Sequence, residues 1–397
     1  MSKKTLRKVT SMALAAAMAV SVLSGCGAKS TKSTDAAAQS IGGGDTIRIG
    51  LTVPLTGDRA TEGSYGSNAA KIVQEEINAN GGVLGKNIEI VIEDSLGTDV
   101  GATTAYLKLA SEEDITAIIG SDNSSDNIAI AGSVESSQVM TTVQGSSPTL
   151  QKTCEESNWM FQLRATDSTL CAALMTYAVK ELGHKTFTVI HDTETASADQ
   201  AKLFTAAIEE LGGTVQADVA FSSGTKDFSA QLAQAQSVGS DAIVIACLQT
   251  EAAIIIQQLR AMGIENDVFG SNAFSDPVAV NLAGEAINGA YSVTAWVPNA
   301  PTELGSAYSK KYQETYNEDC AKAAAQIRDH VYVICEAIEN AGSTDRAAVR
   351  DAMLKITNYE GAITSYDCSK KGNCGLGGLI TQVVDEVPTI VKEVTAE

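Results

Sequence analysis

Two short runs rich in hydroxyl side chains have the composition of an anion-binding site. They are SDNSSD at 121–126 and QGSSP at 144–148. Each follows a β-branched apolar run and stands at the start of a helical pattern, so Ser124 and Ser146 can offer hydroxyls beside free backbone N–H groups, which suits a carboxylate. Plain capping of their own helices is the alternative. Because there are two such loops, and Gly145 permits close backbone approach, the two interpretations are evenly balanced.

Other residue types that carry chemistry form no recognisable site. The histidines, His184, His191 and His330, are too scattered for a zinc-ligand spacing, and the chain has no CxxC pair. It also contains no GxxxxGK[ST], GxGxxG, HExxH or GxSxG motif. We therefore expect no metal, no cofactor and no catalytic residues.

The cysteines leave one question open. Eight are present, and seven follow Cys26. Cys368 and Cys374 flank a Lys-Lys-Gly turn, where a short disulfide loop and two free thiols are equally compatible with the sequence. Cys247 and Cys335 lie in the apolar runs AIVIAC and VYVIC, which predicts buried free thiols.

The charge balance excludes one class of partner. The 397 residues include 48 acidic and 28 basic side chains, for a formal net charge of -20. The first 25 residues carry four cations and no acid, so the remainder has -20 minus 4, or -24. Nucleic-acid binding needs a basic surface, so we expect no nucleic-acid partner.

The N-terminus has the order of an export signal. Cationic residues at positions 3–8 precede the apolar run MALAAAMAVSV, about half of the roughly 20 residues that a membrane-spanning helix needs. The following Leu-Ser-Gly-Cys resembles the lipobox of bacterial lipoproteins, which implies a signal peptide over residues 1–25 and acylation of Cys26. Residues 26–45 are rich in Ser, Thr, Ala and Gly and predict a flexible linker. We expect a domain anchored by lipid to the extracytoplasmic face of the cell membrane.

The loops must be positioned by the elements around them, and the rest of the chain alternates strand and helix patterns. The predicted strands are Thr46–Val53, Lys86–Glu93, Ile115–Gly120, Val139–Val143, Thr186–His191, Thr214–Phe221, Asp241–Ala246 and Asp267–Gly270. The predicted helices include Asn68–Asn80, Ser168–Leu182, Ala201–Leu211 and Thr250–Ala261. A helix-rich stretch covers 303–356 and a β-like stretch 361–394.

Repeated βα units predict an α/β fold with parallel sheets covered by helices on both faces. Four units precede about residue 165 and four follow it, which favours two similar lobes over one sheet. Ligands of open α/β sheets bind beyond the carboxyl ends of the strands. The two hydroxyl-rich loops follow two such ends.

Several segments resemble the branched-chain amino acid-binding, or leucine-binding, family of ABC importer binding proteins. They are IRIGLTVPLTGD (47–58), EEINANGGVLGKNIEIVIEDS (75–95), AIIGSDNSS (117–125), GTKDFSAQLAQAQSVGSDAIVIA (224–246) and HVYVICEAIENAG (330–342). The resemblance covers almost all of residues 46–394. It indicates the family and does not specify the ligand.

This resemblance implies two Rossmann-like lobes joined by a hinge of three chain crossings, the periplasmic binding protein type I arrangement. The crossings fall near Ala165, Thr294 and Leu376, so residues 46–165 and 295–375 form one lobe, and residues 166–294 and 376–397 form the other. Hinge closure captures a small ligand, an amino acid or a relative of one, for delivery to an ABC permease and its ATPase. No covalent chemistry is implied.

The resemblance also implies a set of binding residues. Ser124 and Ser146 match the positions that hold the carboxylate and ammonium of an amino acid, with help from the backbone of Gln144 and from the adjacent Asn123 and Ser125. Five other pocket positions depart from the family pattern. Aromatic residues are replaced by Glu62, Ala196, Leu248 and Arg328, and the acid that meets the ammonium is replaced by Asn272.

These departures bear on the ligand. Without an acid at Asn272, a buried ammonium needs a partner from elsewhere, such as Glu62, Glu194 or Glu251. Glu62 and Arg328 predict a polar pocket and a hydrophilic ligand. The alternatives are that these two side chains pair with each other, or that the alignment is shifted by a residue or two.

Three functional classes fit this sequence. The leading one is a lipoprotein that supplies an ABC importer. A surface-tethered sensor, which presents the closed form to a receptor, is the second, and an extracytoplasmic enzyme on the same fold is the third.

Overall fold

The computed structural model describes residues 46–300 and 302–395 as an α/β protein with two main sheets. The predicted signal peptide, the acylated Cys26 and the linker lie outside the described residues. Among the described helices, none is both long enough and apolar enough to cross a bilayer.

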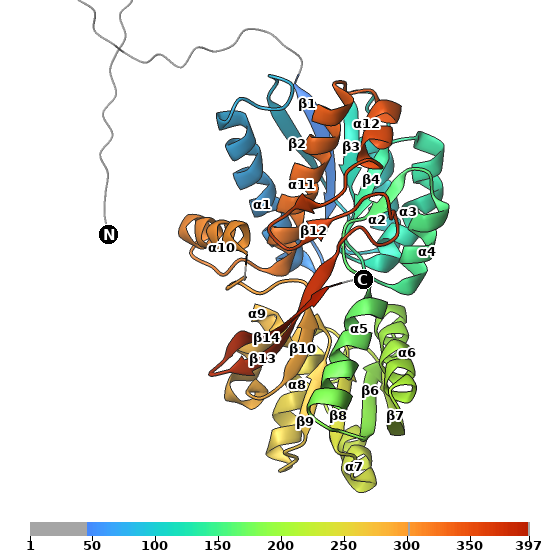
Figure 1. Ribbon diagram of the computed structural model, residues 1–397, viewed down its shortest axis with the longest axis vertical. Coiled ribbons are helices and arrows are strands. Elements are labelled where there is room, and N and C mark those ends of the chain that lie inside the picture. The colour runs from blue at the N-terminus through green and yellow to red at the C-terminus, as the bar shows by residue number, and fades with distance from the viewer. Residues whose placement is uncertain (1–45, 301, 396–397) are drawn as a thin grey trace, which may run out of the picture. The chain divides into compact units, whose positions relative to one another are not determined.

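The first sheet has five parallel strands in the order β2-β1-β3-β4-β5 (Figure 1). The strands are β1 Ile47–Val53, β2 Ile88–Asp94, β3 Ile115–Ile119, β4 Met140–Val143 and β5 Met160–Gln162. The helices between them are α1 Ala60–Ala79, α2 Asp99–Ala110, α3 Ser124–Ser137 and α4 Pro148–Glu156. Three later helices, α10 Glu303–Tyr316, α11 Lys322–Ala341 and α12 Arg346–Met353, complete this lobe, because α11 packs on α1 and α12 on α11.

The second sheet has seven strands in the order β14-β13-β10-β9-β8-β6-β7. They are β6 Thr186–Asp192, β7 Thr214–Phe221, β8 Ala242–Ala246, β9 Asp267–Gly270, β10 Tyr291–Thr294, β13 Gly377–Val384 and β14 Val387–Thr395. The helices are α5 Asp167–Thr176, α6 Thr195–Glu210, α7 Ser229–Val238, α8 Gln249–Ala261 and α9 Pro277–Ala283. A further pair of short strands, β11 Tyr359–Glu360 and β12 Ser365–Tyr366, forms its own antiparallel ladder.

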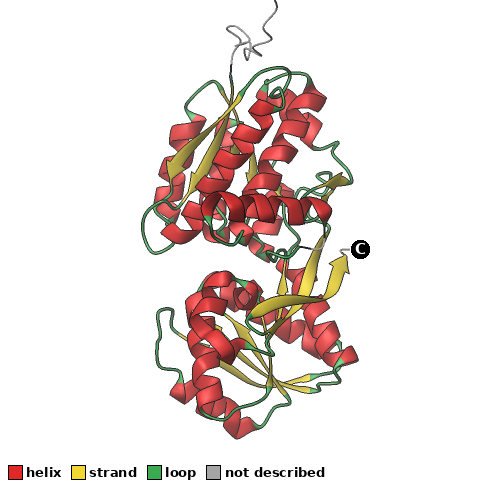
Figure 2. Cartoon of the chain, turned by 90° about the vertical axis from the view of Figure 1, so that its left-hand side faces the viewer, coloured by secondary structure: helices red, strands yellow, loops and turns green. Residues whose placement is uncertain are grey.

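Helices cover both faces of the second sheet (Figure 2). Along the fully buried β8, Ile243 and Ile245 pack into a core with α7 and α8, while Ala242, Val244 and Ala246 pack into a second core with α5 and α6. Successive side chains of a strand point to opposite faces, so both faces are buried. This explains the continuous apolar run AIVIA.

The apolar cores divide along the chain. The core of the five-stranded sheet takes residues from 47–163 and 296–374, and the cores of the seven-stranded sheet take residues from 165–293 and 380–394. The chain therefore passes between the sheets three times. The exact division predicted from the sequence, with crossings near Ala165, Thr294 and Leu376, stays a prediction.

All eight predicted strands are present, and the predicted bounds of β7 and β9 are exact. The short strands β5 and β10 were not predicted, because three or four residues carry too little periodicity. Strands β6 to β10 of the second sheet run parallel, as the βα units predict, whereas β13, from the β-like stretch 361–394, runs antiparallel to both β10 and β14.

Helix starts were the weaker predictions. α1 begins at Ala60 instead of Asn68, because its first two turns bury Gly63 and Gly66 and show no apolar stripe. α6 begins at Thr195 instead of Ala201. The helix predicted over Ser168–Leu182 ends as a π-helical turn at Tyr177–Glu181.

The cysteines in the described part of the chain are all buried free thiols. This confirms the prediction for Cys247 and Cys335. It also places free thiols, both fully buried, at Cys368 and Cys374 in place of the disulfide that the sequence left open.

Candidate functional site

The two hydroxyl-rich loops meet because β3 and β4 are neighbours in the parallel sheet. The backbone N–H of Ser147 donates to Ser124 Oγ at 3.2 Å, which joins the second loop to the first. A Cβ added at Gly145 would lie 2.6 Å from Ser124 Oγ and 2.9 Å from Ser124 Cα. Glycine at 145 is therefore required for the loops to touch.

Neither Ser124 nor Ser146 caps its helix, so the capping alternative is wrong for both. Asn123 caps α3, and its side-chain oxygen accepts from the backbone N–H of Ser125 at 2.8 Å. Ser147 caps α4 by accepting from the backbone N–H of Leu150 at 3.3 Å. The hydroxyl of Ser146 forms no hydrogen bond with any other described residue, although this side chain is only 7% exposed. It is available to a ligand.

Two buried glutamines fix the backbone of these loops. The side-chain amide of Gln144 donates to the carbonyl of Gly120 at 3.2 Å, and that of Gln162 donates to the carbonyl of Gly145 at 2.7 Å. Both side-chain oxygens are buried without a hydrogen-bond partner among the described residues. Orphaned buried acceptors of this kind are rare in native structures unless water or a ligand meets them.

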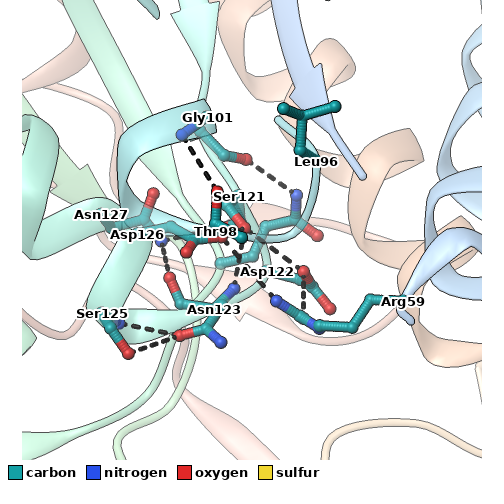
Figure 3. A network of polar contacts seen from close by, with 12 residues as sticks. Arg59, Leu96, Thr98, Gly101, Ser121, Asp122, Asn123, Ser125, Asp126 and Asn127 are labelled. Carbon is teal, nitrogen blue, oxygen red and sulfur yellow. Dashed lines mark hydrogen bonds and ion pairs between the residues drawn. The ribbon is translucent and has the colours of Figure 1, made fainter. Parts of the chain in front are cut away.

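An ion-pair network lies beside the first loop (Figure 3). Arg59, directly before α1, contacts Asp122 with an Nη2–Oδ1 distance of 2.6 Å and approaches Asp126 at 3.7 Å. Burial alone would raise the pKa of Asp122, but the Arg59 and Lys322 cations outweigh it and hold that pKa below its ordinary value. Burial raises the pKa of Asp126, although Ser121 donates a hydrogen bond of 2.7 Å to it.

Glu62, in the first turn of α1, belongs to the same charged region. Burial, followed by repulsion from Asp122 and Asp276, raises the pKa of Glu62. Asp276 is the N-cap of α9 and accepts from the backbone N–H of Val278 at 2.9 Å. The charges of Asp122 and Asp276 therefore act on Glu62, although the three acids come from segments far apart in sequence.

Lys322 is the first residue of α11 and lines a pocket. The pocket is lined by Asn272, Ser275, Asp276, Pro277, Thr294, Trp296, Pro298, Cys320 and Lys322. Burial and the Arg164 cation lower the pKa of Lys322 to about 8, against the opposing effect of the nearby acids Asp122, Asp276 and Asp167. Asn272, at the start of the short 3-10 helix Asn272–Ser275, is the one sequence-predicted residue on this lining.

The remaining predicted residues lie apart from this lining. Ala196 is exposed in the first turn of α6, and Leu248 is the N-cap of α8 with 51% of its surface exposed. Arg328 is buried in α11, where its guanidinium pairs with Asp329 at 2.7 Å and lies 4.4 Å from the ring centre of Tyr332. No ion pair within the described ranges joins Arg328 to Glu62.

The sequence reasoning missed Arg59, Asp122, Lys322 and Asp276. One signal was available. A cation in the first turn of a helix opposes the helix dipole, so Lys322 stands where a structural lysine is disfavoured.

The chain is similar to known proteins over most of its length. Residues 46–378 match the model of the periplasmic binding protein family. A Leu/Ile/Val-binding protein homolog of Brucella melitensis is 26% identical over 82% of this chain and 88% of its own length. The crystal structure of the leucine-binding protein LivK of Thermotoga maritima has a TM-score of 0.80 and 27% identity, over 88% of this chain and 99% of that one.

The same fold occurs in the branched-chain amino acid transporter binding protein LivJ of Streptococcus pneumoniae, solved in complex with isoleucine. The TM-score is 0.78 at 24% identity, over 89% of this chain and 99% of that one. The predicted α/β architecture of the periplasmic binding protein type I class is confirmed.

Proposed function

The chain belongs to the periplasmic binding protein family, and we propose that it is a lipid-anchored, extracytoplasmic protein that captures an amino acid or a similar small polar ligand for an ABC importer. The observation that carries this proposal is the pair of touching loops after β3 and β4. Serines 124 and 146 present side chains there that do not cap their helices. Relatives named for leucine, isoleucine and valine binding support the ligand class.

The loops suit a carboxylate for a physical reason. Ser146 supplies a hydroxyl without a partner in the described chain, and the starts of α3 and α4 bring the positive ends of two helix dipoles to one place. An anion at this position gains both hydrogen bonds and dipole stabilisation. Binding, not bond cleavage, is the role that follows, so the proposal includes no covalent step.

The ammonium of an amino acid needs an acidic partner. Asn272 provides none, but Asp276 lines the same pocket and Glu62 lies in its field. We infer that these two acids replace the missing carboxylate. Burial raises the pKa of both groups, and a ligand ammonium would stabilise their charged forms.

A thermal-shift screen tests ligand capture. The protein lacking residues 1–26 is heated with each amino acid in turn. A ligand present at about a hundredfold excess over its Kd should add about 2.7 kcal/mol to the free energy of unfolding. The proposal is contradicted if no amino acid raises the melting temperature.

The anchor and the importer need separate tests. Fatty-acid labelling of the full chain should mark the wild type and leave Cys26→Ser unlabelled. Cells without this protein should lose uptake of the ligand that the screen identifies. Unchanged uptake, with a lost transcriptional response to that ligand, would favour the sensor instead.

A further inference from the structure

A second pocket adjoins the one around Lys322. It has a volume of about 220 Å³, and Ser275, Pro277 and Pro298 line both pockets. Asp276 stands between two of these residues in the chain but lines only the pocket of Lys322. The two pockets therefore share a wall, and the proposed capture of a solute does not use the second one.

The second pocket is built from elements of both sheets. Asp319 directly precedes the segment of Cys320 and α11, which contributes to the core of the five-stranded sheet. Val280 comes from α9 and Glu386 from the turn between β13 and β14, and these elements belong with the seven-stranded sheet. A molecule in this pocket would therefore contact both groups of elements at once.

Half of the lining is apolar. Val280 is 5% exposed and Val387 is 51% exposed, so one end of the apolar surface is buried and the other reaches solvent. A cavity of about 150 Å³ holds benzene, so this pocket accommodates a compact apolar body of that size or slightly larger. Ligand pockets combine such surfaces with a few polar groups that orient the ligand. The apolar lining residues are Pro277, Val280, Pro298, Val387 and Pro388.

Two carboxylates line the pocket without a cationic partner. Within residues 46–300 and 302–395, no Lys, Arg or His nitrogen lies within 4.0 Å of a carboxylate oxygen of Asp319 or Glu386. Asp319 accepts only a neutral hydrogen bond of 3.3 Å from the Gln313 side chain. Lys311, on the helix that precedes Asp319, pairs with Glu76 instead, at 2.8 Å. Two acids of this kind favour a ligand cation, because charge-assisted hydrogen bonds are the strong ones.

We propose that this pocket is an accessory binding site for a small molecule that combines a compact apolar body with an ammonium group. The apolar body packs against the prolines and valines, and the ammonium meets the carboxylates of Asp319 and Glu386. The serine loops 121–126 and 144–148 contribute nothing to the lining, so this molecule binds apart from the captured solute. Binding involves no covalent step.

Methyl NMR locates the site. The protein lacking residues 1–26 is labelled with ¹³C at the valine methyl groups, and Val→Ala variants assign the signals of Val280, Val387 and Val100. Benzylamine is the probe, and benzyl alcohol is its neutral match. Benzylamine should shift the signals of Val280 and Val387. The signal of Val100, which is 79% exposed on α2, should stay in place.

The same titration measures the role of the charges. Each contact with an exposed carboxylate should strengthen binding by about 1.5- to 5-fold, so benzylamine should bind more tightly than benzyl alcohol by at least that factor. The double variant Asp319→Asn, Glu386→Gln should remove this preference. Both side chains are exposed, so the variant should fold as the wild type does.

Glu156→Gln combined with Glu314→Gln is the matched control. It changes the net charge equally, at side chains that are 70% and 67% exposed and lie outside the lining. The preference for benzylamine should survive in this control variant.

Three results would overturn the accessory site. They are equal affinities for benzylamine and benzyl alcohol, benzylamine shifts that spare Val280 and Val387, and a preference that persists in the Asp319→Asn, Glu386→Gln variant. The probe is not an amino acid, so failure of amino-acid capture in the thermal-shift screen would overturn the proposed function and leave the accessory site standing.

Discussion

Gly145 lies against Ser124 so closely that a Cβ at position 145 would be 2.6 Å from Ser124 Oγ. Contacts this short do not occur between real Cβ atoms and their neighbours, so the loops after β3 and β4 meet only because residue 145 has no side chain. The relationship ties the geometry of these two loops to a single residue.

Gly145→Ala should separate the two loops. Overpacking of this kind costs about 1–3 kcal/mol of unfolding free energy, and ligand affinity should fall with it. Urea unfolding and titration of the ligand measure both. Gly132→Ala, on α3 with no atom within 4 Å of an added Cβ, is the matched control and should be neutral or stabilising by up to about 1 kcal/mol. Equal behaviour of the two variants would contradict the role of Gly145.

Arg59→Met should leave the carboxylates of Asp122 and Asp126 without the Arg59 cation that pairs with them. We expect a loss of about 1.5–3 kcal/mol of unfolding free energy at pH 7, the usual value for a hydrogen bond to a charged group. The pKa of Asp122 lies below its ordinary value, so its contribution is present above about pH 4 and is lost as the pH falls through the folded-state pKa. The difference between variant and wild type in urea unfolding should therefore shrink in acid.

Lys152→Met is a suitable control for that experiment. Lys152 pairs with Glu156 at 3.8 Å, but both side chains are at least 70% exposed, so its loss should cost no more than about 0.5 kcal/mol. A similar loss in both variants would mean that the network around Arg59 has no special role.

Lys322→Met should stabilise the unliganded protein at pH 7. The pKa of Lys322 is about 8 in the folded chain and ordinarily 10.5, so the unfolded chain binds the proton more tightly. Wild-type stability should rise between pH 8 and 10.5 as Lys322 loses its charge, and the advantage of the variant should disappear over that range. Arg164, Asp122, Asp276 and Asp167 are the charged groups that face this lysine. A variant that is less stable at pH 7 would indicate a structural lysine.

His330→Gln should make the free energy of unfolding less dependent on pH in the acid range. His330 is fully buried in α11, and its Nδ1 lies 2.8 Å from Thr142 Oγ1. Burial lowers the pKa of His330 to about 3, so the neutral form stabilises the fold above pH 6.5 and this stability is lost as the pH falls toward 3. The wild type should lose about 1.4 kcal/mol more per pH unit than the variant between pH 6 and 4, measured by urea unfolding. Parallel profiles would contradict this.

The sequence predicted the architecture well because strand signals are local. The run AIVIA at 242–246 is apolar on both faces, and this pattern alone indicates a buried parallel strand. Tyr291–Thr294 is equally buried but has only four residues, so it was missed. The stretch 361–394 was predicted as β-like, but its pairing as the antiparallel hairpin of β13 and β14 was not predicted.

The site was predicted only in part, for a related reason. Ser124 and Ser146 follow strand ends, which the sequence marks. Lys322 and Asp276 are distant in sequence, and only the packed chain brings them to one pocket. Arg328 was predicted to line the ligand pocket. Its guanidinium instead pairs with Asp329 and lies over two aromatic rings.

Native mass spectrometry of the protein lacking residues 1–26, purified without added ligand, tests solute capture most directly. We expect a complex with one small molecule per chain, released on denaturation and identified as a carboxylate that carries an amino group. Gly145→Ala should reduce the bound fraction, and Gly132→Ala should not. A wild-type protein that carries no small molecule, and that gains none when incubated with amino acids, would contradict solute capture.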